Sequence, residues 1–265
     1  MKISVLIPSY NSATYLSQAL ESVLGPLRSG DEVIVQDGGS TDDTLSILQR
    51  VSIADPRVKY VSEPDSGQSN ALNRALNRAS GDLVLWLNAD DIVYPDALNE
   101  ARQKFEQFED LELCIAGHRV LVADGTALGT YPAKRLERDR VMSRGCYVFS
   151  GSILLKRQVL QSLGGFREDL HYCMDLDLML RLSQIPQTKV ATVELPLGAL
   201  RRHEASKSGT VAFAFVRDGW RVRGEHARTW RDQVRRVRVA IEQPIVSAAK
   251  PIRFSRPYRL LRGRL

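Results

Sequence analysis

One amide and two carboxylates, Asn88, Asp90 and Asp91, follow directly after a short apolar segment. The segment, residues 83–87, is five residues long, which is typical of a strand buried on both faces. Side chains two positions apart in an extended chain point the same way, so Asn88 and Asp90 can offer oxygen atoms to a hard divalent cation that also holds phosphates. The alternative is a loop that only caps the next helix, because Pro95 and the acidic residues are also helix-start signals.

Two other apolar segments also end in polar residues. Residues 3–7 lead into Pro8, Ser9, Tyr10 and Asn11, and residues 32–36 lead into Asp37 and a Gly-Gly-Ser-Thr turn. A carboxylate such as Asp37 can accept hydrogen bonds from a nucleobase N–H or from ribose hydroxyls. The alternative for Asp37 is a turn residue that accepts hydrogen bonds from its own backbone.

The first ninety residues predict alternating strands and helices. Apolar segments at 3–7, 32–36, 58–61 and 83–87 read as strands, and the segments between them carry apolar residues at helical spacing. Such alternation predicts an α/β fold with a mostly parallel sheet and right-handed crossovers. The three polar strand ends would then converge on one edge of the sheet, where ligands of open α/β sheets bind.

The pattern changes beyond residue 91. We expect a helix at 95–108, then strands at 113–116 and 119–122 and a hairpin strand at 127–131. Residues 132–146 are expected to form a flexible loop over the site. After this loop we expect a strand at 152–155, a helix that ends at 163, a helix at 174–183 and a strand at 190–195.

The composition is that of a soluble globular chain. Hydrophobic residues make up 43% and charged residues 26% of the 265 positions, and no apolar run approaches the about 20 residues of a transmembrane helix. The first residues read as a strand rather than a signal peptide. The three cysteines are scattered, which predicts neither a disulfide framework nor a metal cluster and favours a reducing, cytoplasmic setting.

Charge is unevenly distributed along the chain. The net charge is +6, yet residues 217–265 hold 14 Lys or Arg against four Asp or Glu, so the rest of the chain is mildly acidic. Arginines alternate there with Trp220, Trp230 and aliphatic residues. This pattern predicts a basic helical extension, residues 211–265, that contacts an anionic membrane surface. The alternatives are a solvated helix packed on the body and, less favoured, a nucleic-acid contact.

The motifs, taken in order, resemble those of the family 2 glycosyltransferases, inverting enzymes with the GT-A fold. The resemblance covers about residues 2–210 and is carried by VLIPSYN (5–11), VIVQDGGSTDDT (33–44), DSGQSNALN (65–73), GD (81–82), NADD (88–91), GGF (164–166) and MDLDLMLR (174–181). It implies a GT-A domain at 1–210, with a nucleotide-binding half at 1–91 and an acceptor-binding half at 92–210.

The resemblance also implies roles for individual residues. The donor nucleotide sugar would be bound by Pro8, Tyr10, Asn11, Asp37, Gln68, Asn70, Asn73, Asn88, Ala89 and Asp90. The family's Asp-x-Asp metal motif falls on Asn88-Ala89-Asp90, where an amide replaces the first carboxylate. Asp90 and His203 would hold Mn²⁺ or Mg²⁺, which neutralises the leaving diphosphate. For Gln68, Asn70 and Asn73 the alternative is helix packing, and for His203 it is a solvated side chain.

The family places its catalytic base in a Glu-Asp pair that opens a helix. Here the pair is Met174-Asp175, so Asp175 is the expected base and the glutamate is missing. An inverting transferase needs such a carboxylate to deprotonate the acceptor hydroxyl. The alternative is that Asp175 only caps its helix.

We therefore expect an inverting, metal-dependent hexosyltransferase that moves a sugar from a nucleotide diphosphate, UDP being the family's usual one, to a hydroxyl of a sugar or lipid-linked sugar. The resemblance places it in bacterial surface polysaccharide or glycolipid synthesis, in the cytoplasm or on the inner face of the membrane. One alternative is a sugar-1-phosphate nucleotidyltransferase, disfavoured because residues 8–11 lack a Gly-rich basic loop. Another is a non-catalytic module that binds nucleotide sugar or membrane.

Overall fold

The computed structural model describes residues 1–203 and 212–254. The strands are β1 (Ile3–Ser9), β2 (Glu32–Asp37), β3 (Val58–Ser62), β4 (Leu83–Trp86), β5 (Ile92–Val93), β6 (Leu113–Val122), β7 (Ala127–Tyr131), β8 (Ile153–Lys156) and β9 (Val190–Arg202). The helices are α1 (Ala13–Leu24), α2 (Thr44–Ala54), α3 (Gln68–Arg78), α4 (Pro95–Gln107), α5 (Arg138–Arg144), α6 (Arg157–Ser162), α7 (Met174–Leu182), α8 (Ala212–Glu225) and α9 (Trp230–Phe254), with short 3₁₀ turns at Ser150–Ser152 and Gln187–Lys189.

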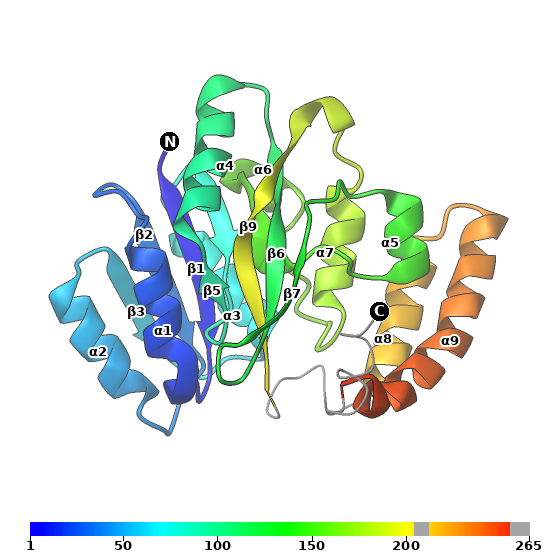
Figure 1. The fold of residues 1–265 in the computed structure, drawn as a ribbon, viewed down its shortest axis with the longest axis horizontal. Helices are drawn as coiled ribbons and strands as arrows, with labels where there is room; N and C mark the ends of the chain where they lie inside the picture. The colour runs from blue at the N-terminus through cyan, green and yellow to red at the C-terminus, as the bar shows by residue number, and fades with distance from the viewer. Residues whose placement is uncertain (204–211, 255–265) are drawn as a thin grey trace.

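In the described part of the chain the strands form a single nine-stranded sheet (Figure 1). Its order is β3-β2-β1-β4-β8-β6-β9-β5, and β7 pairs with β6. The first four strands are parallel, which confirms the α/β prediction for the N-terminal half. Beyond β4 the sheet is mixed: β8 is antiparallel to both β4 and β6, and β6 is parallel to β9.

Helices cover both faces of the sheet because its central strands are apolar on both sides. On β1, Ile3, Val5 and Ile7 pack with apolar residues of α1, α2 and α4, whereas Leu6 packs with residues of α3, α6 and α7 on the other face. Because β1 to β4 are parallel, they end at one common edge of the sheet, and a helix or turn begins just beyond each of them.

Two strand predictions differ from the structure. Residues 113–122 form one continuous strand instead of two, with a register shift at Gly117. A Cβ at Gly117 would lie 2.8 Å from the carbonyl oxygen of Glu194, so only glycine lets β9 pass this closely. The strand predicted at 190–195 continues to Arg202, because its second half pairs with β6 on one side and β5 on the other.

The predicted flexible loop at 132–146 is wrong over its second half, which forms α5. Val141 and Met142 are buried there against residues of α7 and α8. Seven residues are too few to reveal a helical period in sequence.

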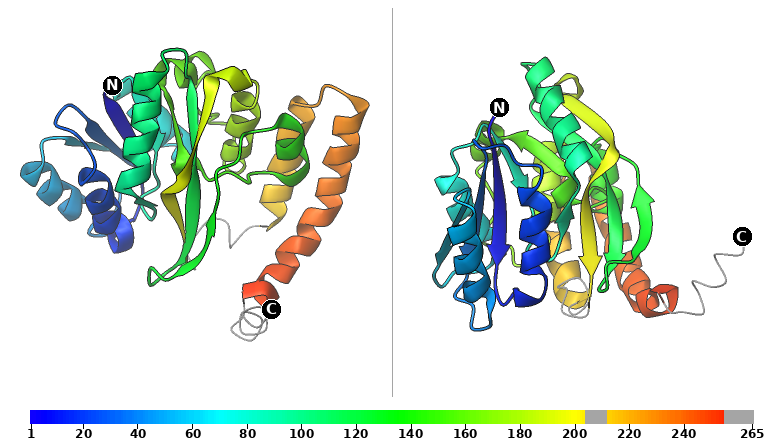
Figure 2. Two further views of the ribbon diagram at one scale, coloured as in Figure 1. Left: turned by 45° about the horizontal axis from the view of Figure 1, so that its top comes forward. Right: turned by 60° about the vertical axis from the view of Figure 1, so that its left-hand side comes forward.

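The helices α8 and α9 follow β9 and pack against each other beside α5 and α7 (Figures 1 and 2). In Figure 1 and in the left-hand view of Figure 2, α9 lies on the far side of α8 and α5 from the sheet. Among the described helices, none is both long and apolar enough to cross a bilayer. The predicted boundary at 210 and the last eleven residues of the basic tail, 255–265, lie outside the described residues.

Candidate active site

The turns after β1 and β2 are held to each other by side chains. Asn11, with a left-handed φ of 48°, accepts a hydrogen bond from the Thr41 amide at its Oδ1 (2.9 Å) and donates its own amide to Ser40 Oγ (2.7 Å). Asp42 accepts hydrogen bonds from the amides of Ala13 and Thr44, both 3.1 Å, at the starts of α1 and α2. The two strand ends therefore form one rigid rim.

Asp37 is fully buried beneath this rim. Its carboxylate accepts the amides of Gly39 (3.1 Å) and Ser40 (2.9 Å) and the hydroxyls of Ser40 (2.5 Å) and Ser62 (2.7 Å). These contacts are those of a turn residue that stabilises its own loop. Asp37 therefore stabilises the rim through internal hydrogen bonds.

A second carboxylate lies where a side chain at position 38 would be. A Cβ added to Gly38 would lie 2.8 Å from Oδ2 of Asp65. The other oxygen of Asp65 accepts the Gly67 amide at 2.8 Å. Oδ2 has no hydrogen bond to any described residue. Because Gly38 has no side chain, this oxygen of the partly exposed Asp65 can lie at the end of β2.

Asn88 sits at the end of β4 with all its polar atoms engaged. Its Oδ1 accepts from Gln68 (2.8 Å) and from the Trp86 indole (2.9 Å), and its Nδ2 donates to Asp91 (2.8 Å). An amide oxygen with two donors is poorly placed to coordinate a cation. Asn88 thus joins Gln68 of α3 to the strand end.

Asp90 and His203 meet across 113 positions of sequence: Nε2 of the imidazole lies 2.9 Å from Asp90 Oδ2. Asp90 is 32% exposed and His203 14% exposed. No three His, Cys, Asp or Glu side chains cluster to hold a metal by themselves within the described residues. The Asp90 carboxylate suits Mn²⁺ or Mg²⁺, whereas an imidazole is a softer ligand that these hard cations take less readily. The pair would therefore hold such a cation only together with further oxygen ligands, such as those of a diphosphate and water.

Arg201 is buried and holds this edge together. Its guanidinium donates to the carbonyl of Asp90 (3.0 Å) and to Gln18 (2.9 Å), and it stacks over the ring of Tyr15, 4.8 Å from the centroid. Its amide donates to Asp91 at 2.9 Å. Burial, and then the charge of Asp90, raise the pKa of Asp91 well above its ordinary value, although the bonds from Arg201 and Asn88 oppose the shift. Arg201 is thus a buried cation whose guanidinium is used in internal contacts.

Asn70 and Asn73 of α3 reach the segment before α7. Both donate to Glu168 at 2.8 Å, and Asn73 also exchanges two hydrogen bonds with the backbone of Phe166. Their positions agree with the packing alternative, since these contacts tie α3 to the Gly-Gly-Phe turn. Glu168 was missed in the sequence because only the fold brings it to α3.

The remaining donor-side residues lie on the same rim. Tyr10 is 64% exposed, Pro8 is buried in β1, and Ala89 is 5% exposed between Asn88 and Asp90. Tyr10, the aromatic residue among the predicted donor-binding residues, therefore has a ring that is open to a ligand.

Asp175 lies in the first turn of α7, where its Oδ1 accepts the amide of Leu176 at 2.8 Å. It borders a cavity that is otherwise mostly apolar and includes Trp86 and Phe166. These two rings meet edge to face at 5.3 Å, and the Trp86 indole also donates to Asn88. Trp86 therefore links the wall beside Asp175 to the β4 strand end.

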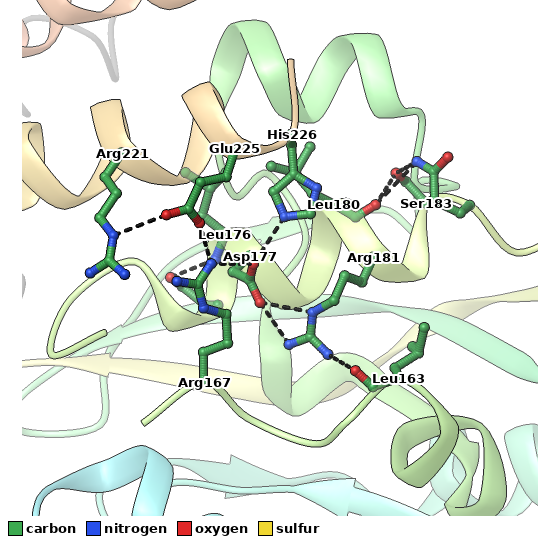
Figure 3. Close-up of polar contacts among 12 residues, drawn as sticks. Leu163, Arg167, Leu176, Asp177, Leu180, Arg181, Ser183, Arg221, Glu225 and His226 are labelled. Atoms are coloured by element: carbon green, nitrogen blue, oxygen red, sulfur yellow. Dashed lines mark hydrogen bonds and ion pairs between the residues drawn. The ribbon is translucent and has the colours of Figure 1, made fainter. Parts of the chain in front are cut away.

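Asp177, two residues further on, lies within a network of charged side chains instead of beside the cavity that Asp175 borders (Figure 3). It is buried. Arg181 bonds it at 2.7–2.8 Å, His226, directly after α8, lies at 2.9 Å, and Arg167 lies at 3.6 Å. Arg167 continues the network to Glu225. Burial alone would raise the pKa of Asp177, but the hydrogen bond from His226 and the charge and hydrogen bond of Arg181 lower it below its ordinary value. The network fixes α7, and hence Asp175, against α8.

A parallel half-sheet continued by a mixed half, with helices on both faces, is the GT-A fold of glycosyltransferases. Residues 4–164 match the model of the family described as glycosyl transferase family 2, and the chain belongs to that family.

Known relatives are longer than this chain. It is 29% identical over 185 residues to a chondroitin synthase of Escherichia coli, covering 69% of this chain and 26% of that protein. It is also 29% identical over 168 residues to a GalNAc(5)-diNAcBac-PP-undecaprenol beta-1,3-glucosyltransferase of Campylobacter jejuni, covering 61% and 53%.

Solved structures share the fold at low identity. S. aureus TarS 1–349 in complex with UDP-GlcNAc has a TM-score of 0.68 at 20% identity, covering 85% of this chain and 66% of that one. The mannosyltransferase PcManGT of Pyrobaculum calidifontis, in complex with GDP-Man and Mn²⁺, has a TM-score of 0.61 at 18% identity, covering 98% and 82%.

Proposed function

We propose that this chain is an inverting, cation-dependent glycosyltransferase that uses a nucleotide-diphosphate sugar, with UDP as the favoured nucleotide. The observation that carries the proposal is the carboxylate–imidazole pair of Asp90 and His203, 2.9 Å apart beyond β4 in a family 2 chain. The UDP-GlcNAc complex of a protein with the same fold supports UDP, and the GDP-Man complex of another keeps GDP as the competitor.

In this proposal residues 1–91 bind the donor nucleotide. The exposed ring of Tyr10 offers a surface on which a base can stack, and Asn11 keeps the turn in place. We assign the hydrogen bond to the base or ribose to Asp65 Oδ2, because all the contacts of Asp37 are internal. Gln68 and Asn88 support the pocket wall beside the sugar.

Asp90 and His203 would hold Mn²⁺ or Mg²⁺ together with the diphosphate. A bound cation supplies positive charge to the leaving diphosphate as the glycosidic bond breaks. The amide at Asn88 leaves Asp90 as the single exposed carboxylate of the motif, because Asp91 is buried. The protein's own contribution is therefore one negative charge and one imidazole, which favours a cation that arrives with the nucleotide.

Asp175 would act as the base, with residues 92–210 forming the acceptor-binding half. The acceptor hydroxyl oxygen forms a bond to the anomeric carbon while its proton passes to the Asp175 carboxylate. The bond from that carbon to the diphosphate oxygen breaks on the opposite face, and its electron pair stays with the diphosphate. The anomeric configuration is thereby inverted.

A sugar carried on a lipid is the acceptor we favour. The Campylobacter jejuni relative, named for a PP-undecaprenol substrate, supports this choice, and a basic extension at 211–265 would suit work at the inner face of a membrane. Synthesis of a surface polysaccharide or glycolipid is the corresponding process.

Calorimetry of UDP, dTDP and GDP binding, with and without Mn²⁺, tests the donor site. One nucleotide should bind, more tightly with Mn²⁺, and Asp90→Ala should abolish the effect of the cation. Asp96→Ala, an exposed carboxylate of α4, is the matched control and should keep it. Absence of nucleotide binding under every condition would refute the transferase proposal. Binding without turnover on any nucleotide sugar would favour the non-catalytic module. Asn88 and Met174, which stand where the family motifs have carboxylates, agree with that alternative.

A further inference from the structure

The helix α9 carries apolar side chains on its solvent side. Trp230 is 72% exposed, Val234 55%, Val237 47% and Ile241 63%. Their spacing of four, three and four residues puts them on one face of the helix. We call these four residues the α9 stripe.

The opposite face of α9 holds the helix on the protein. Asp232 is completely buried, accepts the amides of Arg228 and Thr229 and pairs with Arg138 of the body. Val239 is 8% exposed. At 100° per residue, Asp232 and Val239 lie about 160–180° from the middle of the stripe. The stripe therefore lies opposite the face by which α9 is attached.

Cations border the stripe along one side. Arg231 and Arg238 follow it at about 100° and 80° around the helix from Trp230, and both are exposed. Arg231 lies 5.7 Å from the Trp230 ring, and Arg238 pairs with Glu242. Arg228, in the turn before the helix, is also exposed, and neither Arg228 nor Arg231 forms an ion pair with a described residue.

Other arginines of the same helices are used internally. Arg235 pairs with Asp139 and Asp232, and Arg236 stacks on Trp220 at 3.7 Å and donates to its carbonyl. The cations open to a partner are thus concentrated beside the apolar stripe.

We propose that the α9 stripe is a docking surface for the anionic surface of a lipid bilayer. Trp230 and the three aliphatic side chains enter the boundary between headgroups and acyl chains, where an indole is favoured. Arg228 and Arg231 meet lipid phosphates, and Arg238 exchanges Glu242 for them.

Charge argues for lipid over other occupants of the stripe. A second copy of this chain would bring two arginine-bordered stripes together, and like charges would oppose the contact. A nucleic acid would be bound through the arginines but would leave the four apolar side chains in water. An anionic bilayer satisfies both the apolar and the basic parts.

Docking would also orient the candidate active site. His226, in the turn between α8 and α9, bonds Asp177 of α7, so the helix on the lipid and the helix with Asp175 belong to one connected unit (Figure 3). A lipid-linked acceptor would then lie on the same membrane to which the α9 stripe attaches.

Co-sedimentation of the full chain with vesicles tests the surface. Vesicles of phosphatidylcholine with phosphatidylglycerol should bind the protein, and vesicles of phosphatidylcholine alone should bind it weakly. Trp230→Ser/Ile241→Ser should lower the partition coefficient by at least about tenfold. Ile53→Ser/Phe108→Ser, which removes two exposed apolar side chains elsewhere, should leave it unchanged.

The basic part is tested separately. Arg231→Gln should lower binding to the anionic vesicles about fivefold, whereas Arg50→Gln, an exposed arginine of α2, should not. Equal binding by wild type and the stripe variant would overturn the proposal. So would a dimer that Ile241→Ser dissociates, or binding to DNA that the stripe variant retains. Vesicle binding needs no turnover, so its failure leaves the transferase proposal standing, and the reverse is also true.

Discussion

Two carboxylates in the first turn of α7 stand in opposite environments. Asp175 is partly exposed, borders a cavity, and accepts a hydrogen bond from its neighbour's amide. Asp177 is buried among Arg181, Arg167 and His226. A base needs access to a proton, whereas a buried, paired carboxylate stabilises structure. The geometry therefore agrees with our proposal of Asp175 as the base and gives Asp177 a structural role.

We expect Asp175→Asn to lower kcat by about 10²–10⁴-fold, because the amide cannot take the acceptor proton. Nucleotide affinity and the thermal midpoint should stay near wild type. The paired control, Asp177→Asn, should instead lower the midpoint, since it leaves Arg181 and Arg167 without their buried partner. Steady-state kinetics and circular dichroism on both variants measure this difference. Full activity in Asp175→Asn would exclude it as the base.

The carboxylates at the end of β2 divide in the same way. Asp65→Asn should weaken nucleotide binding about tenfold with little change in stability, because its Oδ2 is open. Asp37→Asn should lower the free energy of unfolding by about 1–3 kcal/mol, because it disturbs four internal hydrogen bonds of a buried group. Calorimetry and urea unfolding separate the two effects. A stable Asp37→Asn protein that no longer binds nucleotide would restore the role first expected for Asp37.

The family resemblance assigns Asp90 and His203 to one cation and so predicts that they lie close together, and their side chains lie 2.9 Å apart. The resemblance did not predict the groups that support them. The bond of Asp91 to Arg201 spans 110 positions and the bonds of Glu168 to α3 span 95 and 98. Such partners depend on how the strands and turns pack, and spacing along the chain carries no trace of them.

At the scale of elements, the parallel strands were predictable because each is a short, mainly apolar segment that alternates with a segment of helical spacing. The second half of β9 was not, since residues 196–202 mix proline, glycine and arginines. Their strand conformation comes from pairing with β5 and β6 on either side. A similar reason hid α5, whose two buried residues belong to an apolar cluster that includes residues of α7 and α8.

Gly198 tests the importance of that pairing. A Cβ there would collide with the backbone of Gly151 and lie 2.9 Å from the Phe149 ring. Gly198→Ala should therefore cost about 1–3 kcal/mol of unfolding free energy. Gly30→Ala, where a Cβ meets nothing within 4 Å, is the control and should be close to neutral. Urea unfolding measures both, and equal stability of the two variants would show that β9 shifts without penalty.

At the scale of the whole molecule, α8 and α9 are attached to the body through buried acids and arginines. The hydrogen bond from Arg138 outweighs the effect of burial and holds the pKa of Asp232 below its ordinary range, and the pKa of Asp177 is lowered as well. A carboxyl with a lowered native pKa stabilises the fold above its unfolded value of about 3.9 and loses that contribution as pH falls through the native value.

Acid should therefore loosen this attachment. We expect the thermal midpoint to fall as pH decreases below about 4, and Asp232→Asn to be less stable at pH 7 and to show a flatter fall. Asp96→Asn, exposed and outside these contacts, should follow the wild-type curve. Circular dichroism melts between pH 7 and pH 3 record the profiles. Identical slopes for wild type and Asp232→Asn would rule out this carboxyl as the cause.

The pairing of Asp90 with His203 has a consequence for biosynthesis. Asp90 and Asp91 leave the ribosome more than a hundred residues before Arg201 and His203. Gln18 is synthesised 183 residues before Arg201, whose guanidinium group it binds. The N-terminal strands can assemble while the chain is still growing, but the carboxylate–imidazole pair exists only once β9 has been inserted beside β5. A nascent chain thus cannot form the cation site that we propose for both residues until β9 has joined the sheet.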